Sequence, residues 1–97
     1  MAKQNEQRKQ EVILYHGSLV ELNSRDPRNQ YKIVGRSYIN SGIPFTNNEN
    51  FVNSVGEDLR REKENWIGLI NLRTVPHETL GSNRIMMHIE GTPIAKA

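Results

Sequence analysis

The sequence predicts a small α+β domain with the element order β-β-α-β-β, in which one helix packs on one face of a sheet rich in antiparallel pairs. The first observation behind this prediction is that β-branched, aromatic and other apolar residues gather in four segments bounded by turn residues, which is typical of strands. These segments span residues 11–22, 31–39, 66–73 and 84–97. The second observation is a helix signal between the second and third segments.

That helix signal begins with Thr46 and Glu49, which have the spacing of a capping box. The apolar residues that follow lie on one face of a helix. They are Phe51, Val52, Val55 and Leu59. We therefore expect a helix from about 47 to 64.

The first strand, 11–22, is partly apolar on both faces, as expected either of a strand covered on both sides or of one that bulges at Gly17. It is followed by a turn at 23–30, where Asp26 precedes a proline. The second strand, 31–39, leads into a loop at 40–44.

The third strand starts at Trp66, and a loop at 74–83 joins it to the last strand as a long hairpin. In the last strand Gly91 and Pro93 suit a strand end or an edge, because proline cannot donate to a ladder.

Size and composition predict a thin core. The chain has 97 residues, of which 35% are hydrophobic and 6% aromatic, so one copy buries little apolar surface. Small domains without disulfides often gain stability by oligomerising, and we expect a homo-oligomer here. Residues 1–10 are polar and are expected to form a flexible tail ahead of a single domain at 11–97.

The absence of cysteine excludes thiolate metal sites, catalytic thiols and disulfides, and fits a reducing compartment. No apolar run approaches the about 18–20 residues that span a bilayer, so no membrane partner is expected. The N-terminal residues lack the hydrophobic stretch of a signal peptide, and the predicted location is cytoplasmic.

Motifs for catalysis are missing from the sequence: there is no nucleophile elbow and no glycine-rich phosphate loop. His77 and Glu78 are adjacent and could supply two metal ligands, but a solvated pair is the commoner outcome, and we assign no metal site. The chain is therefore not expected to be an enzyme, and no cofactor is assigned.

Two groups of residues are candidates for binding. Trp66, Met86 and His88 are the candidate interface, with Trp66 as a packing anchor that buries a large indole. A cavity for a flat ligand beside Trp66 is the alternative. Arg60, Arg61 and Lys63 are the candidate basic patch. The net charge of +2 permits nucleic-acid binding without indicating it.

The second half of the chain resembles a family of small bacterial domains named for heavy-metal binding, to which the lipoprotein sensor of the Rcs envelope-stress pathway is related. The resemblance covers residues 31–97, and its most specific part is Gly91-Thr92-Pro93-Ile94 at the end of the last strand. It implies an α/β domain, often assembled as a symmetric ring, without established enzymatic activity. The family's Gly-Ala-Asn-Ala run is replaced by 63–66, and its metal ligands are not identifiable here.

A second resemblance is to dodecins, small flavin-storing proteins. Residues 31–37, Tyr-Lys-Ile-Val-Gly-Arg-Ser, and Trp66 ahead of a strand are similar to the dodecin order. This resemblance implies flavin stacking on Trp66. The function predicted first is a small oligomeric binding or structural module. Flavin binding and weak nucleic-acid binding are the alternatives.

Overall fold

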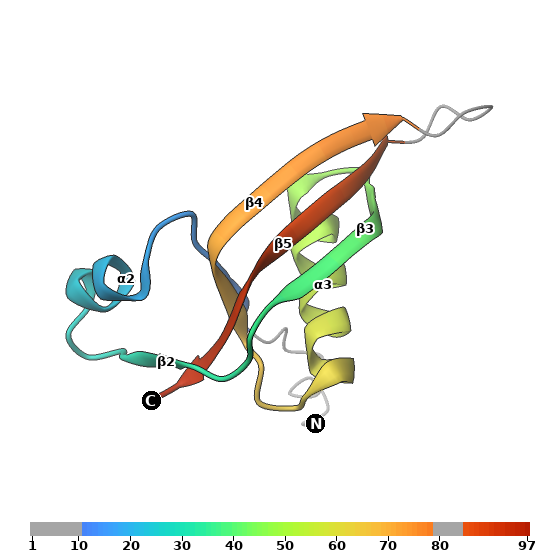
Figure 1. Ribbon diagram of the computed structural model, residues 1–97. Helices are drawn as coiled ribbons and strands as arrows, with labels where there is room; N and C mark the ends of the chain where they lie inside the picture. The colour runs from blue at the N-terminus through green and yellow to red at the C-terminus, as the bar shows by residue number, and fades with distance from the viewer. Residues whose placement is uncertain (1–10, 79–84) are drawn as a thin grey trace, which may run out of the picture.

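The computed structural model, which describes residues 11–78 and 85–97, shows a mixed five-stranded sheet with two helices (Figure 1). This confirms the predicted α+β class and the packing of a helix against the sheet. The strands are β1 (Ile13–Leu14), β2 (Tyr31–Ile33), β3 (Tyr38–Phe45), β4 (Gly68–Glu78) and β5 (Ile85–Lys96). The helices are α2 (Leu19–Arg25) and α3 (Asn48–Glu62).

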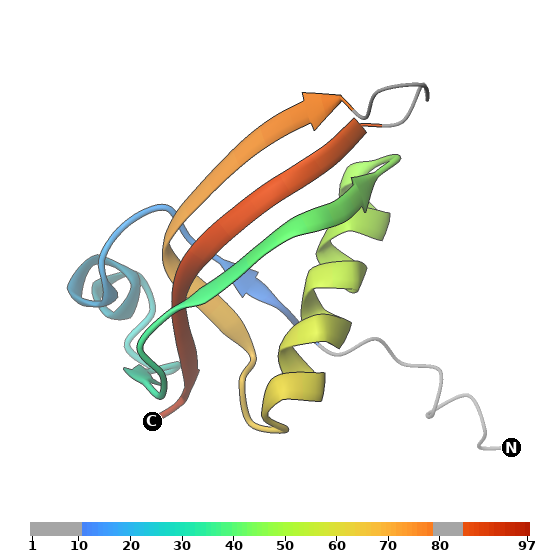
Figure 2. The same cartoon turned by 45° about the vertical axis from the view of Figure 1, so that its right-hand side comes forward.

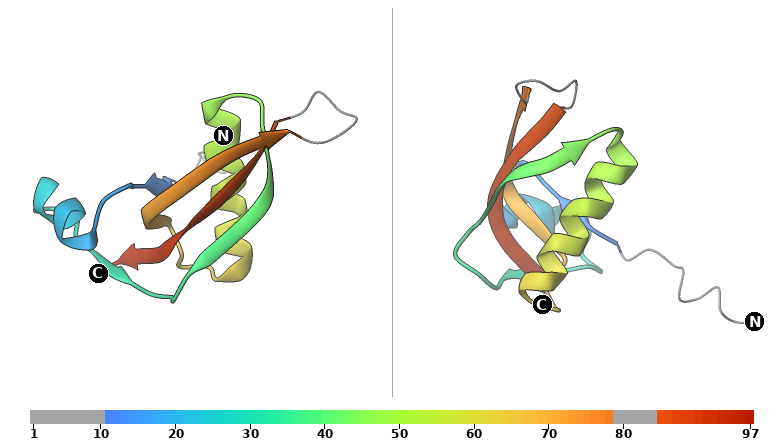
Figure 3. Two further views of the ribbon diagram at one scale, coloured as in Figure 1. Left: turned by 45° about the horizontal axis from the view of Figure 1, so that its top comes forward. Right: turned by 90° about the vertical axis from the view of Figure 1, so that its right-hand side faces the viewer.

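Strand β5 is the centre of the sheet. It pairs antiparallel with β4 along one side, and with β2 and then β3 along the other. The two-residue strand β1 adds to β4 in parallel, which is the one parallel pair among the described strands. Helix α3 runs alongside β3, as Figures 2 and 3 show. The antiparallel-rich sheet that the sequence predicts is therefore present.

Helix α3 forms where the periodicity predicts it, with its start shifted by one residue. The N-cap is Asn47, whose side chain accepts a hydrogen bond of 2.8 Å from the Asn50 amide, while Thr46 accepts one from the Asn50 side chain. Asparagine is as good a cap as threonine because its short side-chain oxygen reaches the amides of the first turn. The buried face carries Phe51, Val55, Gly56 and Leu59.

The single strand expected over 11–22 is wrong. After β1 the chain turns at His16 and Gly17, and α2 begins with a complete capping box between Ser18 and Glu21. The Ser18 hydroxyl accepts from the Glu21 amide at 3.2 Å, and the Glu21 carboxylate accepts from the Ser18 amide at 2.8 Å. These reciprocal bonds satisfy two amides that a strand would need to pair elsewhere, so local capping outweighs β-propensity here.

Two segments expected to be loops belong to strands. Residues 40–44 lie within β3 and residues 74–78 within β4. Both contain a proline: Pro44 lies on the edge strand β3, and Pro76 lies on the part of β4 beyond its pairing with β1, so each faces an open edge where proline is tolerated. The polar tail predicted at 1–10 and the tip of the β4–β5 connection at 79–84 lie outside the described residues.

The core is divided into two clusters on opposite faces of the sheet. Under α3, eight buried residues of the described chain pack together, among them Leu59, Leu69 and Ile89. On the other face, Ile70 and Ile94 pack with Tyr31 beneath α2 and the residues around it. Strand β4 has a β-bulge between Ile70 and Arg73, with Asn71 at φ 51°. Asparagine tolerates this left-handed conformation better than most residues. On the face opposite to α3, Ile70 before the bulge is buried, whereas Arg73 after it is exposed.

Candidate functional site: a cleft between strand β3 and helix α3

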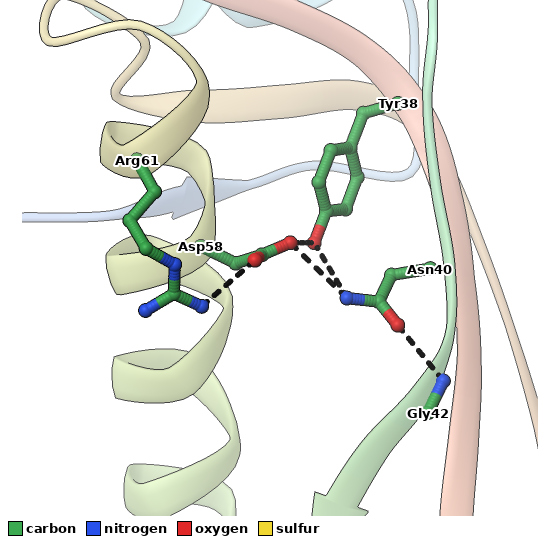
Figure 4. A network of polar contacts seen from close by, with 5 residues as sticks. All are labelled: Tyr38, Asn40, Gly42, Asp58 and Arg61. Carbon is green, nitrogen blue, oxygen red and sulfur yellow. Dashed lines mark hydrogen bonds and ion pairs between the residues drawn. The ribbon is translucent and has the colours of Figure 1, made fainter.

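A polar network joins β3 to α3 and is centred on Asp58 (Figure 4). The Tyr38 hydroxyl donates to Asp58 Oδ2, and Asn40 Nδ2 donates to the same oxygen at 3.1 Å. Arg61 Nη2 binds Asp58 Oδ1 at 2.8 Å from one turn further along the helix. The Asn40 side chain is itself fixed, since its Oδ1 accepts from the Gly42 amide at 2.8 Å.

The network fixes the charge state of its two acidic groups. Burial by itself would raise the pKa of Asp58, but hydrogen bonds from Tyr38, Asn40 and Arg61, with the Arg61 charge, hold the pKa below its usual value. Burial and the hydrogen bond to Asp58 raise the pKa of Tyr38 well above that of a free tyrosine. At neutral pH Asp58 is therefore an anion, and Tyr38 is a neutral donor.

Two adjoining clefts flank this network, and Asn40 and Asp58 line both. The larger has a volume of about 390 Å³ and the smaller about 200 Å³. The larger cleft is lined by Ser37, Tyr38, Ile39, Asn40, Asp58, Glu62 and Trp66. The smaller is lined by Asn40, Gly42, Ile43, Pro44, Ser54, Glu57, Asp58 and Arg61.

Negative charge dominates these clefts. Glu57, Asp58 and Glu62 supply three carboxylates, against the single guanidinium of Arg61. Glu62 follows Asp58 by four residues, so both project from the same face of α3. The negative charge of Glu62 also contributes to the raised pKa of Tyr38, which places that charge near the tyrosine hydroxyl. The site is therefore suited to a cationic ligand.

Trp66 is the one tryptophan of the chain and lines the larger cleft. Its amide donates to the Lys63 carbonyl at 3.1 Å, in the turn between α3 and β4, and its half-buried indole packs on the α3-side core. A Cβ on Gly35 would lie 2.8 Å from Trp66 Cζ2, so the ring rests directly against that glycine. The structure thus places Trp66 at the helix–sheet junction, with part of its surface facing the cleft.

The other two candidate interface residues, Met86 and His88, lie elsewhere. They share one face of β5 with Glu90, the face opposite to that of Ile89 in the α3-side core. Met86 is also eight residues from Ile94, the β5 residue opposite the start of β4, which is roughly 26 Å along a strand. The structure therefore does not bring Trp66 together with Met86 or His88.

The candidate basic patch is not a cluster of free cations. Arg61 is paired with Asp58, and Lys63 is exposed at the end of α3. Arg60 folds back along the helix, so that a Cβ on Gly56 would lie 3.4 Å from its Nη2. Its Nη1 is buried and has no hydrogen-bond partner among the described residues. Three neighbouring basic residues in the sequence thus have three different environments.

A second polar group crosses the face of the sheet opposite to α3. His77 Nε2 lies 3.0 Å from the Ser41 carbonyl oxygen, and Ser41 Oγ lies 2.8 Å from His88 Nδ1. Glu90 Oε2 is 3.6 Å from His88 Nε2, beyond hydrogen-bond distance. The order serine, histidine, glutamate is that of a hydrolytic triad, but the adjacent Gly42 amide already donates to Asn40 and cannot stabilise an oxyanion.

Metal ligation and membrane insertion find no support in the described parts of the chain. Residues 11–78 and 85–97 contain no group of three or more histidine, aspartate or glutamate side chains placed to hold a metal ion. Neither α2 nor α3 is long and apolar enough to cross a bilayer.

Comparison with known proteins identifies no relative of this chain. No protein-family model matches the chain, and neither the curated proteins nor the solved structures include a significant match. The resemblances to the heavy-metal-binding domains and to the dodecins therefore stay predictions.

Sequence reasoning missed Tyr38, Asn40 and Asp58 as parts of one site. Asn40 falls within the loop expected at 40–44, and the sequence alone assigns no role to Asp58. One local signal was available: Asp58 directly precedes Leu59 and follows Val55 by three residues, so it borders the apolar stripe of the helix. A carboxylate at that border is positioned to reach a neighbouring element.

Proposed function

We propose that this chain is a non-catalytic binding module that self-associates through the uncovered part of its sheet. We call this surface the open face. It comprises Ile39, Arg73, Val75, His77, Met86, His88 and Glu90, which the strand registers place on the side of the sheet opposite to α3. The observation that carries the proposal is that Ile39 and Val75 are 61% and 41% exposed there. Exposed apolar side chains that share one uncovered face of a sheet favour an interaction surface there.

The edges of the sheet favour association by this face rather than by strand pairing. The register places the nitrogen of Pro44 on the outer side of β3, and that of Pro76 on the outer side of β4. Each proline removes an amide donor that an added strand would need. A second copy is therefore better accommodated face to face than edge to edge.

The charges on the open face suit a second copy of the chain. Arg73 Nη1 lies 3.3 Å from Glu90 Oε2, and the two side chains are 71% and 32% exposed. In a two-fold arrangement the same patch meets itself, so Arg73 of one copy can approach Glu90 of the other. The apolar residues would then lie between two such pairs.

The non-catalytic part of the proposal is supported by the polar network of the cleft. A general acid or base works best when its pKa lies near the working pH. The pKa of Asp58 is lowered and that of Tyr38 is raised, so both move away from neutrality. These groups are suited to holding β3 against α3 rather than to transferring protons.

Sedimentation equilibrium tests the proposal. We expect the wild-type chain to dimerise, and Val75→Glu to raise the dimer Kd by about tenfold or more, since burying an unpaired polar group costs about 1–3 kcal/mol. The matched control is Val20→Glu, because Val20 is 79% exposed on α2 and lies outside the open face. A monomeric wild type at high concentration, or an equal effect of both substitutions, would contradict the proposal.

A further inference from the structure

We infer that the larger cleft between β3 and α3 binds a guanidinium group, carried either by a small molecule or by an arginine side chain of a peptide. The cleft lies between β3 and α3 and shares only Ile39 with the open face, so this inference does not depend on self-association. It stands on three features: the size of the cleft, the charge of its wall and the position of the indole.

The larger cleft is large enough for a guanidinium group and the aliphatic chain that carries it. A volume of about 390 Å³ falls within the range of small-molecule sites. Its wall is formed by two elements that the polar network fixes relative to each other, β3 through Tyr38 and Asn40, and α3 through Asp58. The cleft is therefore present before any ligand arrives, which lowers the entropic cost of binding.

The two carboxylates that line the larger cleft differ in their capacity to accept further hydrogen bonds. Asp58 Oδ2 already accepts two hydrogen bonds and Oδ1 accepts one from Arg61. Glu62 is exposed and has no hydrogen bond or ion pair with another described residue. The Glu62 carboxylate can therefore accept a ligand's donors, with the negative charge of Asp58 behind it. This local charge is opposite in sign to the net charge of +2 of the whole chain.

Trp66 selects for a flat cation. Its indole lines the same cleft as Glu62, held in place by the core on one side and by Gly35 at its edge. A guanidinium can stack on an aromatic face and at the same time present a planar fork of donors to a carboxylate. An ammonium group can be attracted to the ring, but it lacks the plane and the fork.

The structure already contains one contact between a guanidinium and a carboxylate of this network. Arg61 places its guanidinium on Asp58 Oδ1 at 2.8 Å from the side of the smaller cleft. The ligand's guanidinium would occupy the corresponding position beside Glu62 in the larger cleft. Asp58 then lies between two cations, a common arrangement in a charge network.

Fluorescence titration of the 97-residue chain tests the inference, because Trp66 is its only tryptophan. With arginine amide as the probe, we expect a saturable change in Trp66 emission that weakens as salt is raised. Citrulline amide, whose side chain is uncharged, and lysine amide, which lacks the planar fork, should each bind at least about twofold more weakly. Riboflavin is the comparison ligand for the dodecin resemblance.

The decisive variant is Glu62→Gln, which keeps the shape of the side chain and removes its charge. We expect it to weaken arginine amide binding by about two- to fivefold. The matched control, Glu64→Gln, removes an exposed carboxylate that does not line the cleft, and should leave binding unchanged. Circular dichroism and an unchanged melting temperature show that each variant is folded.

Two comparisons complete the test. A short neutral peptide containing one arginine that binds more tightly than arginine amide would identify a protein segment as the source of the guanidinium, and equal binding would identify a small molecule. The inference is overturned if arginine amide gives no saturable change, if citrulline amide, lysine amide or riboflavin binds as tightly, or if the Glu62 and Glu64 variants lose affinity equally.

Discussion

The two sides of the sheet are covered by helices that are held in different ways. Helix α3 buries four residues, and its cluster is built around side chains that are almost fully inaccessible, such as Val55 and Leu59. Helix α2 buries none of its residues, and Leu19 and Leu22 are only half-buried against Tyr31 and its neighbours. One helix is held by apolar burial, and the other needs additional support.

That support for α2 is polar. Asn23 Oδ1 accepts from the Tyr31 amide at 2.9 Å, and Asn23 Nδ2 donates to the Tyr31 carbonyl at 3.1 Å. Gln30 Nε2 donates to the Asn23 carbonyl at 2.8 Å. With the Ser18–Glu21 capping box, these bonds tie a seven-residue helix to β2. The comparison teaches that a short helix with little to bury can be positioned by a few side-chain to backbone bonds.

The largest expected loss of stability comes from removing a buried apolar side chain of α3. Leu59→Ala should lower the free energy of unfolding by about 2–5 kcal/mol, since it leaves a cavity in the α3-side core. Leu22→Ala should cost about 1–2 kcal/mol, because Leu22 is only partly removed from water. Urea denaturation measures both. Equal losses would show that α2 contributes as much burial as α3.

A smaller loss of stability is expected when a polar contact that holds α2 is removed. Asn23→Ala removes two hydrogen bonds to Tyr31, each with a net contribution of about 0.5–1.5 kcal/mol, so we expect a loss of about 1–2 kcal/mol. Hydrogen exchange should show faster opening confined to α2 and β2. Ser24→Ala is the control, since its hydroxyl makes one exposed bond within α2. Loss of protection in α3 as well would contradict a local role for Asn23.

The smallest effect is on the pH dependence of stability, and it arises from Asp58 on α3. Because the pKa of Asp58 is lower in the folded chain than in the unfolded one, its contribution to stability is present at neutral pH. That contribution is lost as the pH falls below about 4, where the unfolded chain takes up a proton first. Asp58→Asn should flatten the acid limb of stability measured by thermal melts, and Glu64→Gln, which removes an exposed carboxylate in the turn after α3, serves as the comparison. An unchanged acid limb in Asp58→Asn would exclude this role.

Much of the fold could be predicted from local patterns. The apolar stripe from Phe51 to Leu59 predicts α3, and the alternation near the C-terminus predicts β5, because each pattern reports which side of its own segment is buried. The capping box of α2 was readable too, but the β-branched and aromatic residues before it favoured a strand. The candidate site could not be predicted as a unit, since Asn40 and Asp58 are 18 residues apart and meet through the packing of two elements.

The sequence by itself therefore determined the α+β class, the position of the main helix and the strand character of the C-terminal third, through periodicity and capping that act over a few residues. The tertiary structure alone decided that β1 joins β4 in parallel, that two core clusters form on opposite faces of the sheet, and that a negative cleft forms in a chain of positive net charge. The physical reason is that register and helix docking depend on contacts between distant segments, and a local pattern carries no information about which distant segment its buried side will meet.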